Sequence, residues 1–280
     1  MRGIEGKVAL VAGAACPPGL GRATALRLAR AGAAVACVER VEAPTPDGPV
    51  GGLPDSACAT REALEAVVEE IRAEGGRAIP LQADVSRSDQ VENAVAATLE
   101  EFGRLDLCCS VSGGLGPGLG SGELMELAEE SFDRCVELNF KGAWLVARAC
   151  AREMVRAGRG GSIALLSSWA AVPTYRNTSV FCAAKAGVDR LVHGLAWELG
   201  EHGIRVNAVR PLGVDPQASG NPYLQSIVGQ TTAGDWASEK VALRRMQSPA
   251  ETASVLTFLL SDEASFVTGE VVDVSGAGLL

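Results

Sequence analysis

The residues best suited to chemistry lie in one stretch, Ser167–Lys185, which reads SSWAAVPTYRNTSVFCAAK. Lys185 lies near the start of a strong helical pattern, and Phe181 precedes it by one helical turn on the same face. Ser168 lies thirteen positions before Phe181. A hydroxyl and an amine can exchange protons with a reacting oxygen, whereas the phenyl ring can neither donate nor accept a proton.

This pattern resembles the Ser…Tyr-x-x-x-Lys site of the short-chain dehydrogenase/reductase family, with Phe181 at the position of the catalytic tyrosine. In the family the tyrosine protonates the alkoxide formed by hydride transfer, while the lysine lowers the phenol pKa and holds the cofactor ribose. The string ELNFKGAWL places Asn139 and Gly142 where the family has an asparagine that bends a helix near the lysine. Asn139, Ser168 and Lys185 therefore match three of the four expected catalytic positions.

Tyr175 is the alternative source of a phenol. It lies ten residues before Lys185, in a segment expected to be a loop up to Thr178, so it cannot sit one helical turn from the lysine. The enoyl-reductase branch of the family uses a tyrosine seven positions before its lysine, and this chain has Thr178 there. Tyr175 is expected to form a wall of the pocket, with replacement of the missing acid as the second possibility.

A cofactor site is indicated near the N-terminus. The apolar run Lys7–Ala12 leads into the turn and helix GAACPPGLGRATALRLARAG, an arrangement that places helix amides against a dinucleotide pyrophosphate. The next predicted strand, Ala34–Glu39, ends in a carboxylate that can accept the ribose hydroxyls of NAD and repel the extra phosphate of NADP. We therefore predict NAD (NADH) as cofactor, in preference to NADP, bound by Gly13, Gly19, Leu20, Gly21 and Glu39.

The turn resembles the family motif TGxxxGxG but is longer. Ala12 stands in place of the threonine, and five residues rather than three separate Gly13 from Gly19. The pair Pro17-Pro18 stiffens the turn and removes two amide donors, so altered pyrophosphate contacts are expected.

The resemblance implies further cofactor contacts. Asp84 and Val85 would flank the adenine, and Asp84 is also placed to cap the turn before the next helix. Gly113, Lys185 and Pro211 would lie near the nicotinamide half.

Two more departures from the family accompany Phe181. Ser110–Gly113 (SVSG) replaces NNAG, which removes two asparagine amides that bridge neighbouring strands. Leu212 follows Pro211 where the family has glycine. The glycine-rich segment Gly113–Gly122 is expected to form a flap beside the nicotinamide, because it lacks the Lys-Ser/Thr that would make it a phosphate loop.

Length and composition indicate a single α/β domain over 1–280. Apolar residues make up 47% and glycines number 33, which fits a buried core with many tight turns. The resemblance specifies a doubly wound parallel sheet of about seven strands with helices on both faces. Within it, residues 40–60 are expected to form an inserted loop and residues 211–247 a substrate lid. A similar insertion occurs in the carveol-dehydrogenase-like, mycofactocin-associated branch, although a plain surface loop is equally compatible.

The formal net charge of −9 argues against nucleic acid and anionic membranes as partners. The eight cysteines lack the CxxC pairs of a zinc site, so no metal is expected and the thiols are predicted to be reduced and structural. No leader or long apolar segment is apparent, which favours a cytoplasmic location. The C-terminal segment resembles the part of the family that packs between subunits, and a homotetramer or a dimer is expected by analogy.

Two functions follow from these patterns. The first is NAD-dependent hydride transfer on a fairly apolar carbonyl, alcohol or conjugated small-molecule substrate, such as one of secondary metabolism. The second is a redox-neutral reaction, such as dehydration, cyclisation or isomerisation, or a non-catalytic role beside an active homologue. The three departures, at Phe181, Ser110–Ser112 and Leu212, motivate the second hypothesis.

Overall fold

A seven-stranded, entirely parallel sheet forms the centre of the protein, as predicted. The computed structural model describes residues 1–16, 19–41, 60–173, 175–214 and 233–278. The strand order is β3-β2-β1-β4-β7-β8-β9. The strands are β1 (Val8–Ala12), β2 (Ala34–Glu39), β3 (Arg77–Gln82), β4 (Leu107–Ser110), β7 (Gly161–Leu166), β8 (Ile204–Pro211) and β9 (Val271–Val274).

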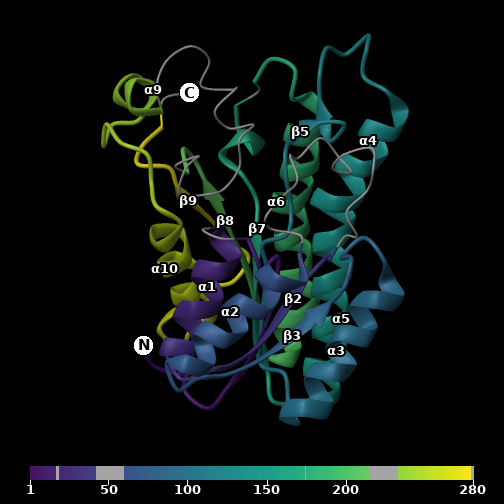
Figure 1. Cartoon of the computed structure of the whole chain (residues 1–280), viewed down its shortest axis with the longest axis vertical. Coiled ribbons are helices and arrows are strands. Elements are labelled where there is room, and N and C mark those ends of the chain that lie inside the picture. The colour runs from purple at the N-terminus through teal and green to yellow at the C-terminus, as the bar shows by residue number, and fades with distance from the viewer. Residues whose placement is uncertain (17–18, 42–59, 174, 215–232, 279–280) are drawn as a thin grey trace.

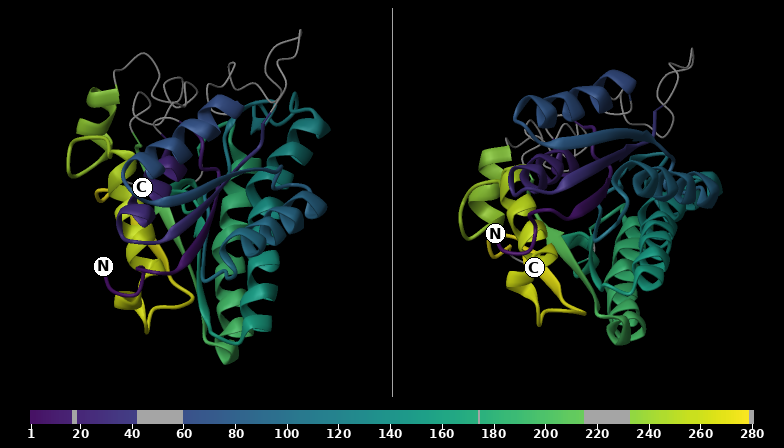
Figure 2. Two further views of the ribbon diagram at one scale, coloured as in Figure 1. Left: turned by 60° about the horizontal axis from the view of Figure 1, so that its bottom comes forward. Right: turned by 90° about the horizontal axis from the view of Figure 1, so that it is seen from below.

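Helices cover both faces of the sheet (Figures 1 and 2). One face carries α1 (Leu20–Arg30), α2 (Arg61–Ala73) and α10 (Pro249–Leu260). The opposite face carries α3 (Ser88–Phe102), α5 (Gly142–Ala157) and α6 (Ser179–Leu199). The remaining helices of the described residues are α4 (Glu129–Val136) and α9 (Ala233–Lys240).

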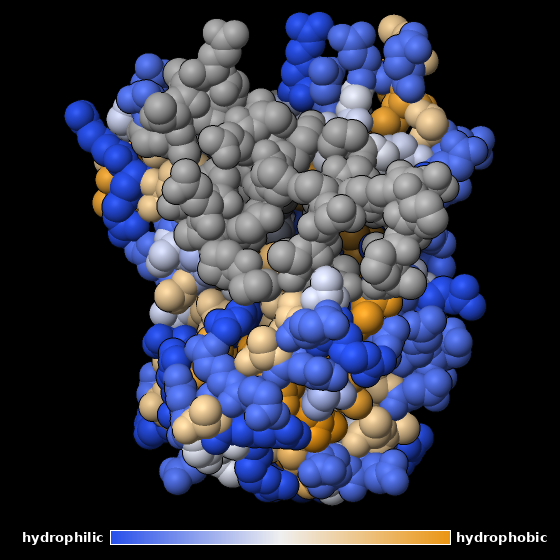
Figure 3. All heavy atoms as spheres, in the orientation of Figure 1, coloured by the Kyte–Doolittle hydropathy of each residue, from blue (hydrophilic) through white to orange (hydrophobic). Residues whose placement is uncertain are grey.

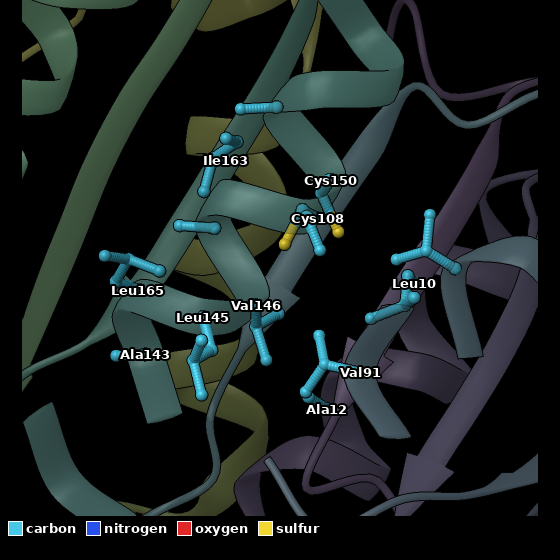
Figure 4. Close-up of a cluster of buried hydrophobic side chains, with 14 of the residues drawn as sticks. Leu10, Ala12, Val91, Cys108, Ala143, Leu145, Val146, Cys150, Ile163 and Leu165 are labelled. Carbon is cyan, nitrogen blue, oxygen red and sulfur yellow. The ribbon is translucent and has the colours of Figure 1, made fainter. Parts of the chain in front are cut away.

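The central strands are apolar throughout because both of their faces are covered. All five residues of β1, VALVA, are buried, which is the pattern expected of a parallel strand between two helical layers. On the α5 side, Cys108 of β4 and Ile163 of β7 pack toward Val146 and Cys150 of α5 (Figure 4). This packing holds β4 and β7 against α5. It therefore also positions the segments that follow these strands after Ser110 and Leu166.

The helical segment that contains Asn139 is not a regular α-helix throughout. The turn Glu137–Lys141 between α4 and α5 is π-helical, and Asn139 lies at its centre. The Asn139 amide donates to the Cys135 carbonyl 3.1 Å away and to the Gly114 carbonyl 2.9 Å away. A π-helical turn of this kind often marks a functional site.

The segment after β4 contains some regular structure. The flap expected over Gly113–Gly122 contains two short paired strands, β5 (Gly116–Pro117) and β6 (Gly120–Ser121). Of the lid expected over 211–247, α9 is described, whereas residues 215–232 lie outside the described residues, as does most of the insertion expected over 40–60.

The cysteines follow the prediction with one exception. Six of them carry free thiols that are buried: Cys37, Cys108, Cys109, Cys135, Cys150 and Cys182. Cys16 is disulfide-bonded, so the expectation of reduced thiols is wrong for this residue. Among the described residues no group of three His, Cys, Asp or Glu side chains is arranged to hold a metal ion.

The surface is largely polar. On the face drawn in Figure 3, hydrophilic side chains predominate among the described residues, and apolar side chains form scattered patches. Within the described ranges, no helix has both the length and the apolar character needed to cross a bilayer.

Candidate active site

The strand order reverses direction between β1 and β4, so the chain leaves these two neighbours toward opposite sides of the sheet. In open α/β sheets this point, at the carboxyl ends of the strands, is where ligands bind. Gly13 follows β1, and Gly113 lies three residues after β4. The predicted cofactor and catalytic residues are therefore placed on the two sides of one crevice.

The Gly-rich turn after β1 requires glycine for close packing. Gly13 has a φ of +87°, and a Cβ on it would lie 2.8 Å from the Ser112 backbone nitrogen. A Cβ on Gly21 would collide with the Gly13 carbonyl. Gly19 is the N-cap of α1, and Leu20 is the first residue of this helix. Pro17 and Pro18 lie outside the described residues.

Glu39, the last residue of β2, reaches back to this turn. Its carboxylate accepts hydrogen bonds from the backbone nitrogens of Ala15 and Arg40, each at 3.1 Å. Burial nevertheless raises the pKa of Glu39 to about 7, despite these two donors. The carboxyl group is therefore positioned beside the glycine turn, and its charge changes near neutral pH.

Asp84 and Val85, predicted to flank the adenine, follow β3 on the same side of the crevice. Asp84 Oδ2 lies 3.9 Å from Arg40 Nη1, and its Oδ1 accepts from both the amide and the hydroxyl of Ser86. Asp84 thus caps the turn before α3, as one of the two interpretations predicted. Val85 is buried and lies against Gly142 at the start of α5.

Three predicted residues meet on the other side of the crevice. A Cβ on Gly113 would lie 2.9 Å from Asn139 Oδ1 and 3.0 Å from Lys185 Nζ, so both side chains reach the same glycine. Asn139 Oδ1 also accepts from the Gly114 nitrogen at 3.0 Å. Three separate elements, the β4 loop, the π-helical turn and α6, therefore converge here.

Lys185 is held as a buried cation. Its side chain is 2% exposed, and Nζ donates to the carbonyl of Leu166, the last residue of β7, at 3.0 Å. Burial lowers the pKa of Lys185 to about 8, although the fields of Cys135 and Asp189 partly oppose the shift. An amine in this range is partly protonated near neutral pH and can donate or accept a proton.

The serines after β7 have different roles. The Ser167 hydroxyl donates to the Lys185 carbonyl at 3.2 Å and so joins β7 to α6. The Ser168 hydroxyl accepts from the Ala170 nitrogen at 3.2 Å, which leaves its own proton available to a ligand. Ser168 is half-buried, as a residue that contacts substrate should be.

Phe181 lies on α6 one turn before Lys185, with the lysine Nζ 5.8 Å from its ring centroid. The ring is buried in a small apolar cluster that includes Leu115, Cys135 and Cys182. Tyr175 packs against this cluster from the loop before α6, and burial raises its phenol pKa. Thr178 does not supply an acid here, because its hydroxyl donates to the Tyr175 carbonyl at 2.8 Å.

Pro211 ends β8, and the next residue, Leu212, is joined to β9 through a 3.0 Å hydrogen bond from its nitrogen to the Val274 carbonyl. The site also contains groups that sequence reasoning missed. The Leu166 carbonyl that holds Lys185 is a backbone atom and leaves no signal in residue types. Cys135 lies 3.6 Å from the Asn139 amide, and its helical spacing of four residues from Asn139 could have indicated it.

A doubly wound sheet with a glycine turn at the switch point and a buried lysine opposite defines the class of dinucleotide-binding α/β proteins. Comparison with known sequences specifies the family. The model of the family described as "Enoyl-(Acyl carrier protein) reductase" matches residues 56–278. A putative short-chain type dehydrogenase/reductase of Mycolicibacterium smegmatis is 30% identical over 285 residues, covering 99% of this chain and 98% of that protein. The chain belongs to the short-chain dehydrogenase/reductase family.

Two further similarities bear on the site. An uncharacterized NAD-dependent oxidoreductase of Mycobacterium tuberculosis is 31% identical over 278 residues, which cover 99% of this chain and 97% of the relative. The crystal structure of carveol dehydrogenase from Mycobacterium avium in complex with NAD superimposes with a TM-score of 0.86 at 29% identity. That alignment covers 99% of this chain and 98% of the carveol dehydrogenase chain.

Proposed function

We propose that this protein transfers a hydride between NAD(H) and a fairly apolar carbonyl, alcohol or conjugated substrate, with Phe181 at the family's tyrosine position. The observation that carries the proposal is the meeting of Lys185 Nζ and Asn139 Oδ1 at Gly113, across the crevice from Glu39. The names of the M. tuberculosis and M. avium proteins support NAD as the cofactor and an alcohol as one possible substrate.

The residues present fit a dinucleotide. Gly13 and Gly21 pack so closely that a Cβ on Gly21 would collide with the Gly13 carbonyl, which suits the close backbone approach of a pyrophosphate at the start of α1. Glu39 is placed for the adenosine ribose, Asp84 and Val85 for the adenine, and Lys185 for the nicotinamide ribose. When bound, NAD(H) supplies or accepts the hydride.

The side chains of the catalytic residues suit a substrate that needs little acid catalysis. Ser168 can donate a hydrogen bond to the reacting oxygen, and the Lys185 ammonium stabilises negative charge that develops there. The phenyl ring of Phe181 has no ionisable proton. The proton that the reduced substrate needs therefore comes from Ser168, Tyr175, water or the substrate itself. A conjugated enone or an iminium, whose hydride adduct is not a strong alkoxide, depends least on the missing phenol.

The test is a titration with NADH and with NADPH, followed by cofactor fluorescence, on the wild-type protein and Glu39→Ala. We expect NADH to bind more tightly than NADPH, and the preference to decrease in Glu39→Ala. Binding of neither cofactor would refute the redox proposal. If Glu39→Ala keeps the same preference for NADH over NADPH, the proposed role of Glu39 is refuted, but the proposed activity is not.

The burial of Phe181 against Lys185 also supports a second candidate function. A site that keeps a lysine and an asparagine but has a phenyl ring in place of a phenol can serve a redox-neutral reaction, or a partner role beside an active homologue. Product formation without any change in NADH absorbance, across a panel of carbonyl and alcohol compounds, would favour this second function over the first.

We also propose a homotetramer or a dimer, located in the cytoplasm. Large apolar side chains at the surface support association: Trp197 is 89% exposed and Phe266 is fully exposed in the single chain. Light scattering coupled to gel filtration tests the assembly, and a monomeric mass at micromolar concentration would contradict it.

A further inference from the structure

The residue after Ser168 carries a buried donor without a partner. The Trp169 side chain is 8% exposed, and its indole Nε1 is buried with no hydrogen-bond partner. Only four buried side-chain atoms in the described part of the chain lack a partner in this way. A buried indole N–H normally finds an acceptor, because leaving the donor unsatisfied has a large free-energy cost.

The backbone carbonyls near the Trp169 indole accept hydrogen bonds from other donors. A Cβ on Gly278 would lie 3.5 Å from Trp169 Nε1 and would collide with the Leu212 side chain, so the C-terminal segment passes between these two residues. The carbonyls of Gly276 and Ala277 accept from the nitrogens of Leu243 and Ala242, each at 3.2 Å. The Leu212 carbonyl accepts from Gln247 Nε2 at 2.8 Å. The surrounding backbone is therefore committed to other donors.

The C-terminal segment is also held in an unfavourable backbone conformation. Gly276 and Ala277 have φ values of +59° and +57°, and the left-handed region is disfavoured for alanine. Such conformations persist where the surroundings enforce them, and they often occur at ligand sites. The unsatisfied indole N–H of Trp169, the residue after Ser168, therefore lies beside a C-terminal segment with an unfavourable backbone conformation at Ala277.

We propose that the indole N–H of Trp169 donates a hydrogen bond to a second oxygen of the substrate, distinct from the oxygen that reacts. The proposal rests on the proposed function, in which Ser168 contacts the reacting oxygen. The Trp169 indole and the Leu212 side chain both lie beside Gly278, and Leu212 follows Pro211 at the end of β8, so the indole is placed at the end of the sheet where Ser168 lies. The substrate class is a carbonyl or alcohol compound with an additional ether, carbonyl or hydroxyl oxygen nearby, and Trp169 selects against the purely hydrocarbon analogue.

The test uses the variant Trp169→Phe, which removes the N–H and keeps an aromatic ring, with Trp144→Phe, a partly exposed tryptophan of α5, as the matched control. The probes are 2-, 3- and 4-methoxycyclohexanone with the corresponding ethylcyclohexanones, which replace the ether oxygen with a methylene. NADH oxidation is followed for each pair. We expect the wild type to prefer at least one methoxy compound by about tenfold in kcat/KM, the effect of one good hydrogen bond. Trp169→Phe should lose this preference and leave the ethyl series within about twofold.

A measurement without substrate provides the second arm. In the free protein the indole N–H resonance of Trp169, assigned by its absence in Trp169→Phe, should have the upfield chemical shift of an N–H without an acceptor. A downfield chemical shift in the free protein, typical of a hydrogen-bonded indole, would mean that the N–H has a partner within the protein and would overturn the proposal.

The remaining outcomes also separate the two proposals. If NADH binds but no methoxy compound is preferred, whether through equal turnover or no turnover of either series, the role of Trp169 is refuted and the redox proposal stands. If Trp169→Phe weakens NADH binding itself, the donor serves the cofactor and the substrate role is wrong. Failure of the wild type to bind NADH refutes the proposed function and this inference with it.

Discussion

The two sides of the crevice position their polar groups in different ways. In what we name the cofactor half, the turn Gly13–Gly21 with Glu39, the carboxylate is oriented by nearby backbone amides. In the catalytic half, Gly113, Asn139, Phe181 and Lys185, the side chains come from three elements and are fixed by distant backbone carbonyls. The charge of the cofactor half therefore depends on the protonation of one carboxyl group, Glu39. In the catalytic half, hydrogen bonds to backbone carbonyls hold the side chains of Asn139 and Lys185 in place.

The largest expected effect comes from removing that cation. Lys185→Met should lower kcat/KM by about 10² to 10⁴, the range typical of losing a positioned proton-handling group. In the wild type the rate of reduction should fall above pH 8, where the buried amine loses its proton. Steady-state kinetics from pH 6 to 10 measure both effects.

The matched control for Lys185→Met is Lys141→Met, a half-exposed lysine of the π-helical turn that pairs with Glu137 at 3.3 Å. It should leave the pH profile unchanged. Because burying a charge is costly, Lys185→Met should not lower the melting temperature. If Lys185→Met has the same kinetics as the wild type, the catalytic half is not used for catalysis.

Restoring the phenol is the next prediction. Phe181→Tyr places a hydroxyl at the end of a ring that already lies beside Lys185, and should raise the reduction of simple ketones by about 10²-fold or more. Phe181→Leu, which keeps the apolar volume without a hydroxyl, should give no gain. If Phe181→Tyr reduces no tested ketone faster than the wild type, the other residues of the catalytic half do not support ketone reduction. That result would favour the redox-neutral function.

The cofactor half should respond to pH through one group. Burial raises the pKa of Glu39 to about 7, so the carboxylate that repels the extra phosphate of NADPH is charged at pH 8 and largely neutral at pH 6. The ratio of the NADPH to the NADH dissociation constant should therefore decrease severalfold between pH 8 and pH 6. Glu39→Gln controls for titration of the phosphate itself, and its ratio should vary much less.

The same shift affects stability with a defined sign. The pKa of Glu39 is higher in the folded protein than its ordinary 4.5, so folding binds a proton in this window. The associated stability is fully present below about pH 4.5 and is lost as the pH rises through 7. Glu39→Gln should raise the melting temperature at pH 8 and have little effect at pH 5. The opposite order would mean that the carboxylate is stabilised when charged.

The two halves also differ in how far the sequence predicts them. The glycine turn and Glu39 belong to one strand–turn–helix–strand unit, so the local sequence pattern predicts them, and the resemblance to the family specifies the doubly wound sheet. The resemblance to the family's motifs predicts Asn139, Ser168 and Lys185, but it does not predict the groups that hold their side chains. Lys185 is held by the Leu166 carbonyl, and the π-helical turn at Asn139 depends on the carbonyls of Cys135 and Gly114. Backbone acceptors carry no residue-specific signal.

The smallest expected effect concerns two buried serines on adjacent strands. Ser110 ends β4 at a position where the family has asparagine, and its hydroxyl is buried without a partner. Ser162, on β7, is equally buried, but its hydroxyl donates to the Leu259 carbonyl at 3.2 Å. Ser110→Ala should therefore leave the free energy of unfolding unchanged or raise it, whereas Ser162→Ala should lower it by about 1 kcal/mol.

Urea unfolding of the two variants under the same conditions decides between these outcomes. A loss at Ser110 as large as that at Ser162 would mean that the Ser110 hydroxyl is satisfied in solution. If instead only Ser162→Ala is destabilising, the end of β4 retains a polar group that folding does not need. That group lies at the strand switch point, where the two halves of the site meet, so a hydroxyl that folding does not need is placed at the end of the sheet where ligands bind.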